Sequence, residues 1–312
     1  MSRQKGFPYV ACLMCEGLPA GRFPIHSRYL CAMDYRDFWR ALSPALGPGE
    51  AKAVARLVYG ERFGLSYGDL LVGKVSNLTE EGREWLAVAV RRLSAGEPVQ
   101  YVLEYAEFCG RRFAVGPGVL VPRPETEELC RMVAASIAGK RAARILDACC
   151  GSGCIGVTLA LETPGAEVCA WDLYEAPLQT TMRNAGALGA RVNVERVDVL
   201  AAVPCGEEWD AIVSNPPYVM ESEKGGMGAN VLDYEPHEAL FVEDTDPMLF
   251  YRAISRYAAG ALRPGGGLFF EVNPLCAGGV VRMMEECGLE GASVWQDCFG
   301  RERFATAVKP TA

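Results

Sequence analysis

The chain has 312 residues, of which 50% are apolar and 22% are charged, a composition typical of a soluble globular protein with room for two domains. No apolar run approaches the ~18 residues needed to cross a membrane, and the N-terminus lacks the layout of a signal peptide, so we expect a cytoplasmic protein. The net charge is −8, and residues 123–312 carry 16 basic and 27 acidic side chains, which disfavours an enzyme that binds nucleic acid through a basic face.

Residues 1–32 show neither a helical nor a strand period, and we interpret them as an irregular extension before a second candidate initiator, Met33. The 13 cysteines of the chain lack the spacing of a disulfide module, which favours reduced and mostly buried thiols. Because glycine and proline make the extension irregular, we predict no metal site there. The zinc ligands that it could offer are Cys12, Cys15, His26 and Cys31.

Residues 33–95 have the pattern of a small helical domain. Asp34 is a good N-cap for a first helix, which Pro44 is expected to end. Apolar residues recur at helical spacing in three further segments, residues 50–59, residues 66–72 and a longer helix capped by Thr79. A helical core explains these apolar stripes, and we assign them no chemistry.

Residues 96–122 are predicted to link the helical domain to the next one. A glycine and a proline break the preceding helix, and residues 105–115 alternate as a β-hairpin that turns at a glycine. The helix that follows has Pro124 near its first turn and acids where the helix dipole favours them. Two residues of this stretch indicate contact with a ligand, Arg123 and Thr126.

A glycine-containing turn follows a buried strand that begins at Arg144 and precedes an apolar helix over residues 155–161. Missing Cβ atoms let a backbone approach a ligand, and the amides of the next helix point toward it. The turn could serve a dinucleotide, but it lacks the full G-x-G-x-x-G spacing. Its residues are Cys149, Cys150, Gly151, Ser152 and Gly153.

An acid, Asp172, ends the next predicted strand, nineteen residues beyond Gly153. Such an acid is placed to accept hydrogen bonds from ribose hydroxyls. The alternative is a cap for the helix predicted over residues 175–188. A further strand over residues 192–197 leads to Val199, which we expect beside an adenine. Together with the glycine turn, these residues indicate an adenosine-bearing cofactor.

The chain is organised around a short apolar strand, residues 211–213, that stops at Asn215-Pro216-Pro217-Tyr218. Two consecutive prolines cannot donate backbone hydrogen bonds, so the strand ends in a rigid turn at the carboxyl edge of the sheet, where ligands bind in open α/β folds. The Asn215 side-chain oxygen and the Pro216 carbonyl could accept both hydrogens of a planar NH2 group. An ordinary Asn-Pro turn is the structural alternative.

The remaining pattern alternates strands with helices and finishes in two strands. This order predicts one doubly wound α/β domain with an antiparallel finish, from about residue 123 to the end. The elements expected after the Asn215 turn are helices over residues 247–262 and 278–287 and strands over residues 268–272, 292–296 and 304–308.

The Asn215 turn, the glycine turn and Asp172 together resemble the Rossmann-like class I S-adenosylmethionine-dependent methyltransferases that act on planar nitrogens. Further segments narrow the resemblance to the family of peptide chain release factor N5-glutamine methyltransferases. These segments are Val-Pro-Arg-Pro-Glu-Thr-Glu-Glu-Leu at residues 121–129, Glu-Pro-x-Gln-Tyr at residues 97–101 and Tyr-Glu-Pro at residues 234–236.

The resemblance implies S-adenosylmethionine as cofactor and, as partner, a class I release factor whose Gly-Gly-Gln loop supplies the glutamine amide. It further implies a substrate-recognition domain at residues 33–95, a β-hairpin linker at residues 96–122 and the methyltransferase domain at residues 123–312. By position, the cofactor contacts are Cys149, Cys150, Gly151, Ser152, Gly153, Asp172, Val199 and Asn215, and the amide is held by Asn215, Pro216, Pro217 and Tyr218.

Two residues depart from the family pattern. Cys149 stands where the wider class has a glycine, and Val199 stands where some relatives have an aromatic residue beside the adenine. Neither change removes a reacting group.

Three other functions compete with this one. Methyltransferases of a ribosomal protein glutamine look similar but lack the Arg-Pro-Glu-Thr-Glu form. Nucleic-acid amino methyltransferases share the Asn-Pro-Pro-Tyr turn, but they need a target-recognition domain or a basic face, and neither is evident in the sequence. A cofactor-binding scaffold without activity is the third, and it is disfavoured because the whole set of motif residues is intact.

Overall fold

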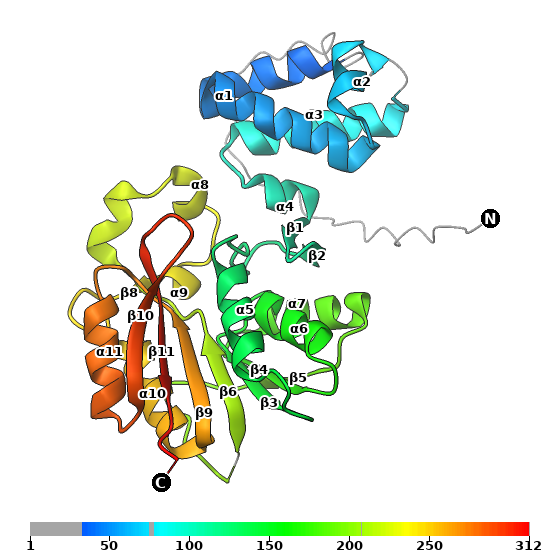
Figure 1. Ribbon diagram of the computed structural model, residues 1–312. Coiled ribbons are helices and arrows are strands. Elements are labelled where there is room, and N and C mark those ends of the chain that lie inside the picture. The colour runs from blue at the N-terminus through cyan, green and yellow to red at the C-terminus, as the bar shows by residue number, and fades with distance from the viewer. Residues whose placement is uncertain (1–32, 75–77, 207, 312) are drawn as a thin grey trace.

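The computed structural model describes residues 33–74, 78–206 and 208–311. They form a helical domain, a short connecting segment and a larger α/β domain (Figure 1). The predictions for residues 1–32, including the zinc ligands weighed there, lie outside the described residues. Within the described part of the chain, no helix is both long and apolar enough to cross a membrane.

The helical domain consists of α1 (Tyr35–Phe63), α2 (Tyr67–Leu71) and α3 (Glu80–Ser94). Each begins at a side chain that satisfies an unpaired amide of the first turn. Asp34 accepts from Asp37 N at 2.8 Å, and Thr79 accepts from Gly82 N at 3.1 Å. The core between the helices is fully buried, with Phe38, Leu42, Tyr59 and Leu86 at 0% exposure.

The prediction that Pro44 ends the first helix is wrong. Helix α1 runs past Pro44, and the chain departs from helical geometry at Gly47, where φ is 76°. Proline removes one backbone donor and kinks a helix, but a residue with positive φ is what breaks it here, and glycine takes that conformation without steric cost. The two predicted helices are therefore two halves of one kinked element.

The connecting segment contains the predicted hairpin, β1 (Tyr105–Phe108) and β2 (Arg111–Ala114), paired antiparallel. It also contains a short helix that was not predicted, α4 (Val99–Leu103). Phe108 and Phe113 of the hairpin are buried in the same cluster as residues of the α/β domain. The hairpin is thus docked on that domain, while the proposed boundaries of the domains stay a prediction.

The α/β domain is built on a seven-stranded sheet of order β10-β11-β9-β6-β3-β4-β5. All neighbouring strands from β9 to β5 run parallel, whereas β11 is antiparallel to both β9 and β10. The predicted doubly wound sheet with an antiparallel finish is confirmed. The strands are β3 (Arg144–Ala148), β4 (Glu167–Asp172), β5 (Val192–Arg196), β6 (Trp209–Ser214), β9 (Leu262–Glu271), β10 (Glu290–Gln296) and β11 (Glu302–Val308).

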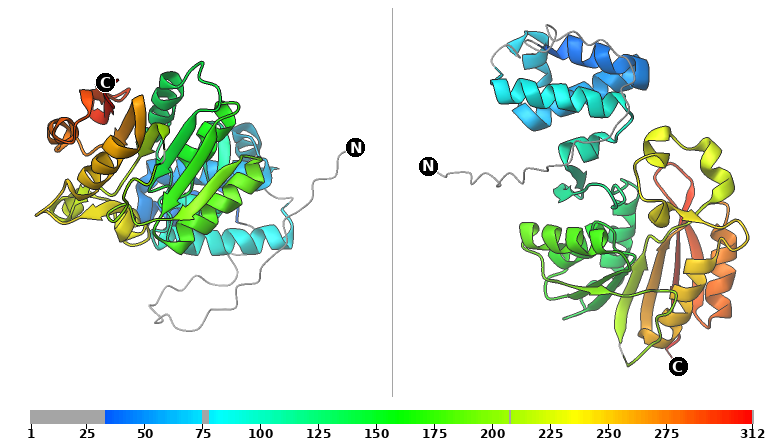
Figure 2. Two further views of the ribbon diagram at one scale, coloured as in Figure 1. Left: turned by 90° about the horizontal axis from the view of Figure 1, so that it is seen from below. Right: turned by 180° about the vertical axis from the view of Figure 1, so that it is seen from behind.

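Helices cover both faces of the sheet (Figure 2). Neighbouring strand residues belong to opposite cores: Ile145 packs with α5, α6 and α7, and Leu146 packs with α10 and α11. Strands buried on both faces are uniformly apolar, which explains why their sequences do not alternate. The helices are α5 (Thr126–Ser136), α6 (Cys154–Glu162), α7 (Glu175–Leu188), α10 (Leu249–Ala261) and α11 (Ala277–Glu286).

A long excursion follows the Asn215 turn, and no helix or strand was predicted in it. Tyr234 of this excursion reaches the helical domain, where its hydroxyl donates to Ala95 O at 2.9 Å. Short elements with few local contacts carry little sequence periodicity, so their pattern was not predictable. They are β7 (Val219–Met220), a 3-10 turn (Glu221–Gly226), α8 (Ala229–Leu232), α9 (His237–Leu240) and β8 (Phe241–Val242).

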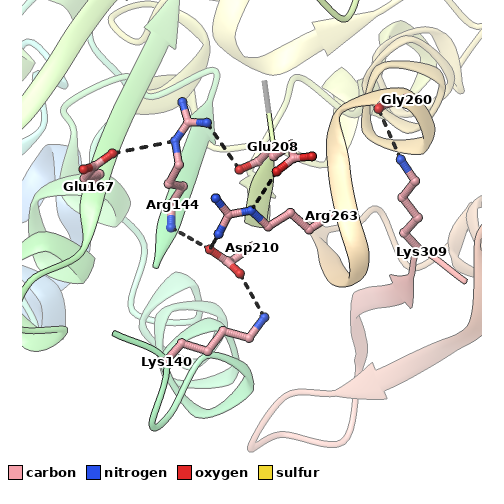
Figure 3. Close-up of polar contacts among 8 residues, drawn as sticks. All are labelled: Lys140, Arg144, Glu167, Glu208, Asp210, Gly260, Arg263 and Lys309. Carbon is pink, nitrogen blue, oxygen red and sulfur yellow. Dashed lines mark hydrogen bonds and ion pairs between the residues drawn. The ribbon is translucent and has the colours of Figure 1, made fainter. Parts of the chain in front are cut away.

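The opposite, amino-terminal end of the sheet is fastened by one carboxylate, Asp210 of β6 (Figure 3). Its oxygens accept from Lys140 Nζ at 3.1 Å, from Arg144 N at 2.9 Å and from Arg263 Nη1 at 2.9 Å. The segment before β3, the start of β6 and the start of β9 therefore meet at a single side chain.

Candidate active site

A pocket opens at the carboxyl ends of β6, β3 and β4, three adjacent strands. From β3 the chain winds outward to β4 and β5 on one side and returns to β6 and β9 on the other, so this is the topological switch point at which such sheets bind ligands. The predicted site residues that line the pocket are Cys149, Cys150, Gly151, Ser152, Asp172, Val199, Asn215 and Pro217. The three predicted residues that are not part of the lining are Gly153, Pro216 and Tyr218.

The turn after β3 takes left-handed backbone conformations. Cys149 has φ 61° and Gly151 has φ 56°, a region that glycine enters freely and a cysteine enters at a cost. Burial raises the pKa of the Cys149 thiol, which therefore stays protonated. Gly153 serves packing, since a Cβ there would lie 2.7 Å from Thr181 Cγ2.

Asp172, at the end of β4, accepts hydrogen bonds from two neighbouring backbone amides. Its Oδ2 accepts from Gly151 N at 3.0 Å and its Oδ1 from Tyr174 N at 3.2 Å. Burial raises the pKa of this carboxyl, although the backbone hydrogen bonds oppose the shift. Each oxygen keeps a second lone pair for a ligand hydroxyl. The N-cap position of α7 is held by Tyr174, whose amide donates to Asp172, so Asp172 also serves the start of this helix.

Asn215 directly follows β6 and lies in the pocket wall. Its Nδ2 is 3.5 Å from the hydroxyl of Thr126, the first residue of α5. At the other end of the turn, the Tyr218 hydroxyl donates to Glu271 at 3.0 Å. Pro216 and Pro217 between them are buried. The turn is thus held at both ends, as a rigid ligand-binding turn requires.

Two segments distant in sequence form the outer walls, the stretch 118–123 before α5 and the stretch 236–239 of the excursion. Glu235 joins them, because its carboxylate accepts from Val121 N at 3.0 Å and from Arg123 Nη2 at 2.7 Å. Arg123 and Thr126, which the sequence marked for ligand contact, both line the pocket. The Tyr-Glu-Pro motif at residues 234–236 indicated this wall in the sequence, but the sequence did not show that Glu235 contacts Val121 and Arg123.

Much of the remaining lining is apolar and was not predicted. The apolar lining residues include Leu120, Ile155, Leu173, Leu200 and Phe250.

Asp147, in the strand that precedes the glycine turn, is fully buried. Its Oδ2 accepts from Gly156 N at 2.8 Å, and burial raises its pKa to about 7. Its Oδ1 has no hydrogen-bond partner among the described residues. Among those residues, no three His, Cys, Asp or Glu side chains gather as a metal site.

Comparison with known proteins adds an independent observation. Residues 125–234 match the model of the methyltransferase small domain, and residues 38–103 match the model of the PrmC N-terminal domain. A release factor glutamine methyltransferase of Bacteroides thetaiotaomicron is 43% identical over 269 residues, which cover 86% of this chain and 96% of that protein. The corresponding protein of Cereibacter sphaeroides is 37% identical over 281 residues, covering 88% and 99%.

Among solved structures, a methyltransferase from Pyrococcus furiosus is similar with a TM-score of 0.47 and 17% identity, covering 65% of this chain and 91% of that one.

Proposed function

The chain belongs to the release factor glutamine methyltransferase family, and we propose that it methylates the side-chain amide nitrogen of the glutamine in the Gly-Gly-Gln loop of class I peptide chain release factors. One observation carries the proposal: the glycine turn, Asp172, Val199 and Asn215 line a single pocket. The groups that we propose to bind a nucleoside and an amide are therefore within reach of one another.

The residues present fit S-adenosylmethionine by the chemistry of their donor set. Asp172 offers carboxylate lone pairs for ribose hydroxyls, and Val199 with Leu200 offers apolar surface for a flat base. Backbone amides of the glycine turn, free of Cβ atoms at Gly151, suit the polar end of the molecule. When bound, S-adenosylmethionine supplies a methyl group already activated on a sulfonium.

The task left to the chain is to aim the amide nitrogen. Delocalisation into the carbonyl makes this nitrogen a poor nucleophile. If Asn215 Oδ1 and the Pro216 carbonyl accept its two hydrogens, they favour the geometry in which the lone pair is free, and they stabilise the positive charge that grows on nitrogen. The N-methylated amide is very acidic before it loses its proton, so no strong base in the pocket is required.

The partner that we propose is a protein. Residues 123–312 carry 27 acidic against 16 basic side chains, a balance that opposes tight binding to a polyanion. The helical domain contacts the excursion through Tyr234 and Ala95, and it is the part of the chain that we propose receives the release factor. Release factors act in the cytoplasm, so the proposal puts this protein there as well.

A labelling panel tests the proposal. The protein is incubated with tritiated S-adenosylmethionine and, separately, with a class I release factor, ribosomal protein, duplex DNA and ribosomal RNA. We expect label on the release factor alone, and none on a release factor whose Gly-Gly-Gln glutamine is replaced by alanine. Labelling of the ribosomal protein or a nucleic acid, with the release factor unlabelled, overturns the proposal in favour of one of its competitors.

A further inference from the structure

A buried acid, Glu271, stands behind the Asn215 turn. It ends β9, the strand beside β6, and is 1% exposed. One carboxylate oxygen accepts from the Thr126 hydroxyl at 2.6 Å, and the other accepts from the Tyr218 hydroxyl at 3.0 Å. A single side chain therefore holds the first residue of α5 and the last residue of the turn.

The polarity of these bonds follows from a count of protons. A carboxylate only accepts, and a threonine hydroxyl has one hydrogen to donate. Because Thr126 gives that hydrogen to Glu271, only its lone pairs remain for Asn215. The Asn215 group that approaches Thr126, at 3.5 Å, must then be its NH2, and its oxygen faces away from Thr126.

We propose that Glu271 is a positioning residue that fixes the orientation of the Asn215 amide, so that its oxygen is offered to the N–H of the bound substrate amide. This inference rests on the proposed function. The two ends of an amide side chain have nearly the same shape, so packing alone cannot choose between them, and the choice falls to hydrogen-bond polarity. In the flipped orientation Asn215 presents an NH2 group to the substrate NH2, donor against donor.

The burial of Glu271 is costly for stability, which supports a functional role. Burial raises the pKa of this carboxyl, while the hydrogen bonds from Thr126 and Tyr218 and the nearby charge of Arg303 lower it. A protonated Glu271 would itself donate to Thr126 and free the threonine hydrogen for Asn215. The hydrogen bond between Thr126 and Asn215 would then have no preferred direction. The hydroxyls that donate to the two oxygens of Glu271, at 2.6 Å and 3.0 Å, oppose the effect of burial and favour the ionised form.

Glu271→Gln tests the inference with almost no change in shape. Glutamine keeps one acceptor and replaces the other by an NH2 donor, so the Thr126 and Tyr218 hydroxyls can no longer both donate to this side chain. The fixed direction of the Thr126 bond is then lost, and the Asn215 amide can flip. With saturating cofactor and release factor, we expect kcat to fall roughly 10- to 50-fold, with cofactor affinity and the KM for release factor within about threefold of wild type. Glu290→Gln, the same change at an exposed site on β10, is the matched control and should keep the wild-type rate.

A second pair of variants keeps the test decisive if Glu271→Gln does not fold. Thr126→Val removes the hydroxyl at nearly constant volume and should lower kcat by a similar factor. Thr126→Ser restores the hydroxyl and should recover most of that loss. If the valine variant keeps the wild-type kcat, or if serine recovers nothing, the proposed chain from Glu271 through Thr126 to Asn215 is wrong.

A double-mutant cycle separates positioning from a general structural effect. In an Asn215→Ala background, Glu271→Gln should lower kcat by less than about threefold further, because the group on which it acts is gone. Multiplying losses would overturn the inference, as would a wild-type kcat in Glu271→Gln. If wild type does not label the release factor, the proposed function fails. If wild type labels it but Asn215→Ala keeps the full rate, or if Asn215→Ala is slow and Glu271→Gln is unaffected, the inference about Glu271 fails and the proposed function stands.

Discussion

The two ends of the central sheet hold their acids in opposite ways. At the amino end, Asp210 is buried, yet hydrogen bonds from the Arg144 backbone and from Lys140, with the charge of Arg263, bring its pKa below the ordinary value. At the carboxyl end, burial raises the pKa of Asp147, Asp172 and Glu271. The donors to these three acids are backbone amides and hydroxyls.

The difference separates stability from function within one sheet. Neutralised by two cations, Asp210 can join three segments at a gain in stability. At the carboxyl end, Asp172 lines the pocket and Glu271 accepts a hydrogen bond from the lining residue Thr126, and an uncompensated buried carboxylate lowers the free energy of unfolding. Substitution of Asp210 should therefore lower stability and spare the rate, whereas substitution of Asp172 or Glu271 should change binding or rate.

The largest effect on stability is expected for Asp210→Ala. The change leaves the Arg144 amide without its acceptor and removes both ion pairs, whose cations are 38% exposed and regain water. We expect the free energy of unfolding to fall by about 3 kcal/mol, with kcat of the folded enzyme unchanged. Urea unfolding and initial rates measure the two quantities. A loss below ~1 kcal/mol, or a loss of rate in fully folded protein, would contradict the assignment.

Asp172→Ala should act mainly on cofactor binding. Loss of a carboxylate acceptor costs about 1.5–3 kcal/mol per charge-assisted contact, so the affinity for S-adenosylmethionine should fall roughly 10- to 150-fold. Saturating cofactor should largely restore the rate, because Asp172 takes no part in the chemistry. A calorimetric titration that finds unchanged affinity rules this role out.

Asp147 should make stability depend on pH in the opposite direction from Asp210. Its folded pKa, about 7, lies above the unfolded value near 4, so the wild-type protein loses stability as pH rises between these values. Asp147→Asn lacks this dependence, and its stability relative to wild type should rise by about 1.4 kcal/mol for each pH unit between these two pKa values.

Asp210 has a lowered pKa, so its own contribution is present above pH ~4 and is lost as pH falls further. Asp210→Asn relative to wild type should therefore lose stability as pH rises from 3 to 5. Thermal denaturation of both variants across pH 3–8 measures both slopes, and slopes of equal sign would break the contrast between the two ends.

The smallest effect on stability is expected for Cys149→Gly. The left-handed backbone of Cys149, with φ 61°, costs roughly 1 kcal/mol for a residue with a Cβ, and Cys149→Gly removes this cost but adds a similar entropy to the unfolded chain. The free energy of unfolding should change by less than about 1 kcal/mol. Cys149→Val, β-branched in the same conformation, should lose at least ~2 kcal/mol. Equal stability of the glycine and valine variants would show that the backbone is not strained.

The elements with local signals were predictable from the sequence. The caps Asp34 and Thr79 begin the helices they were expected to begin, and two prolines end β6 because they cannot extend a ladder. That Asn215 and the glycine turn lie at the same edge of the sheet followed from the rule that the carboxyl ends of parallel strands share an edge. These signals depend on a few neighbouring residues, which is why they can be read without coordinates.

What was missed depends on contacts between distant segments. Helix α4 has only five residues, and the excursion over residues 219–242 has no repeating pattern. Glu271 was visible as a single acid in an apolar strand, but its partners Thr126 and Tyr218 come from elements 145 and 53 residues away. The kink at Gly47 was misplaced because a proline three residues earlier is the stronger local signal.

The rate at which Asn215→Ala methylates the release factor glutamine tests the role of the Asn215 turn most directly. Single turnovers with saturating cofactor, followed by mass spectrometry of the Gly-Gly-Gln peptide, measure methyl incorporation at that side chain. With wild type we expect one methyl group on the glutamine amide. With Asn215→Ala we expect the rate to fall by about 100-fold or more, and release factor binding to change little. A methyl group on another residue, or equal rates for the two proteins, would contradict the claim that this turn aims the amide.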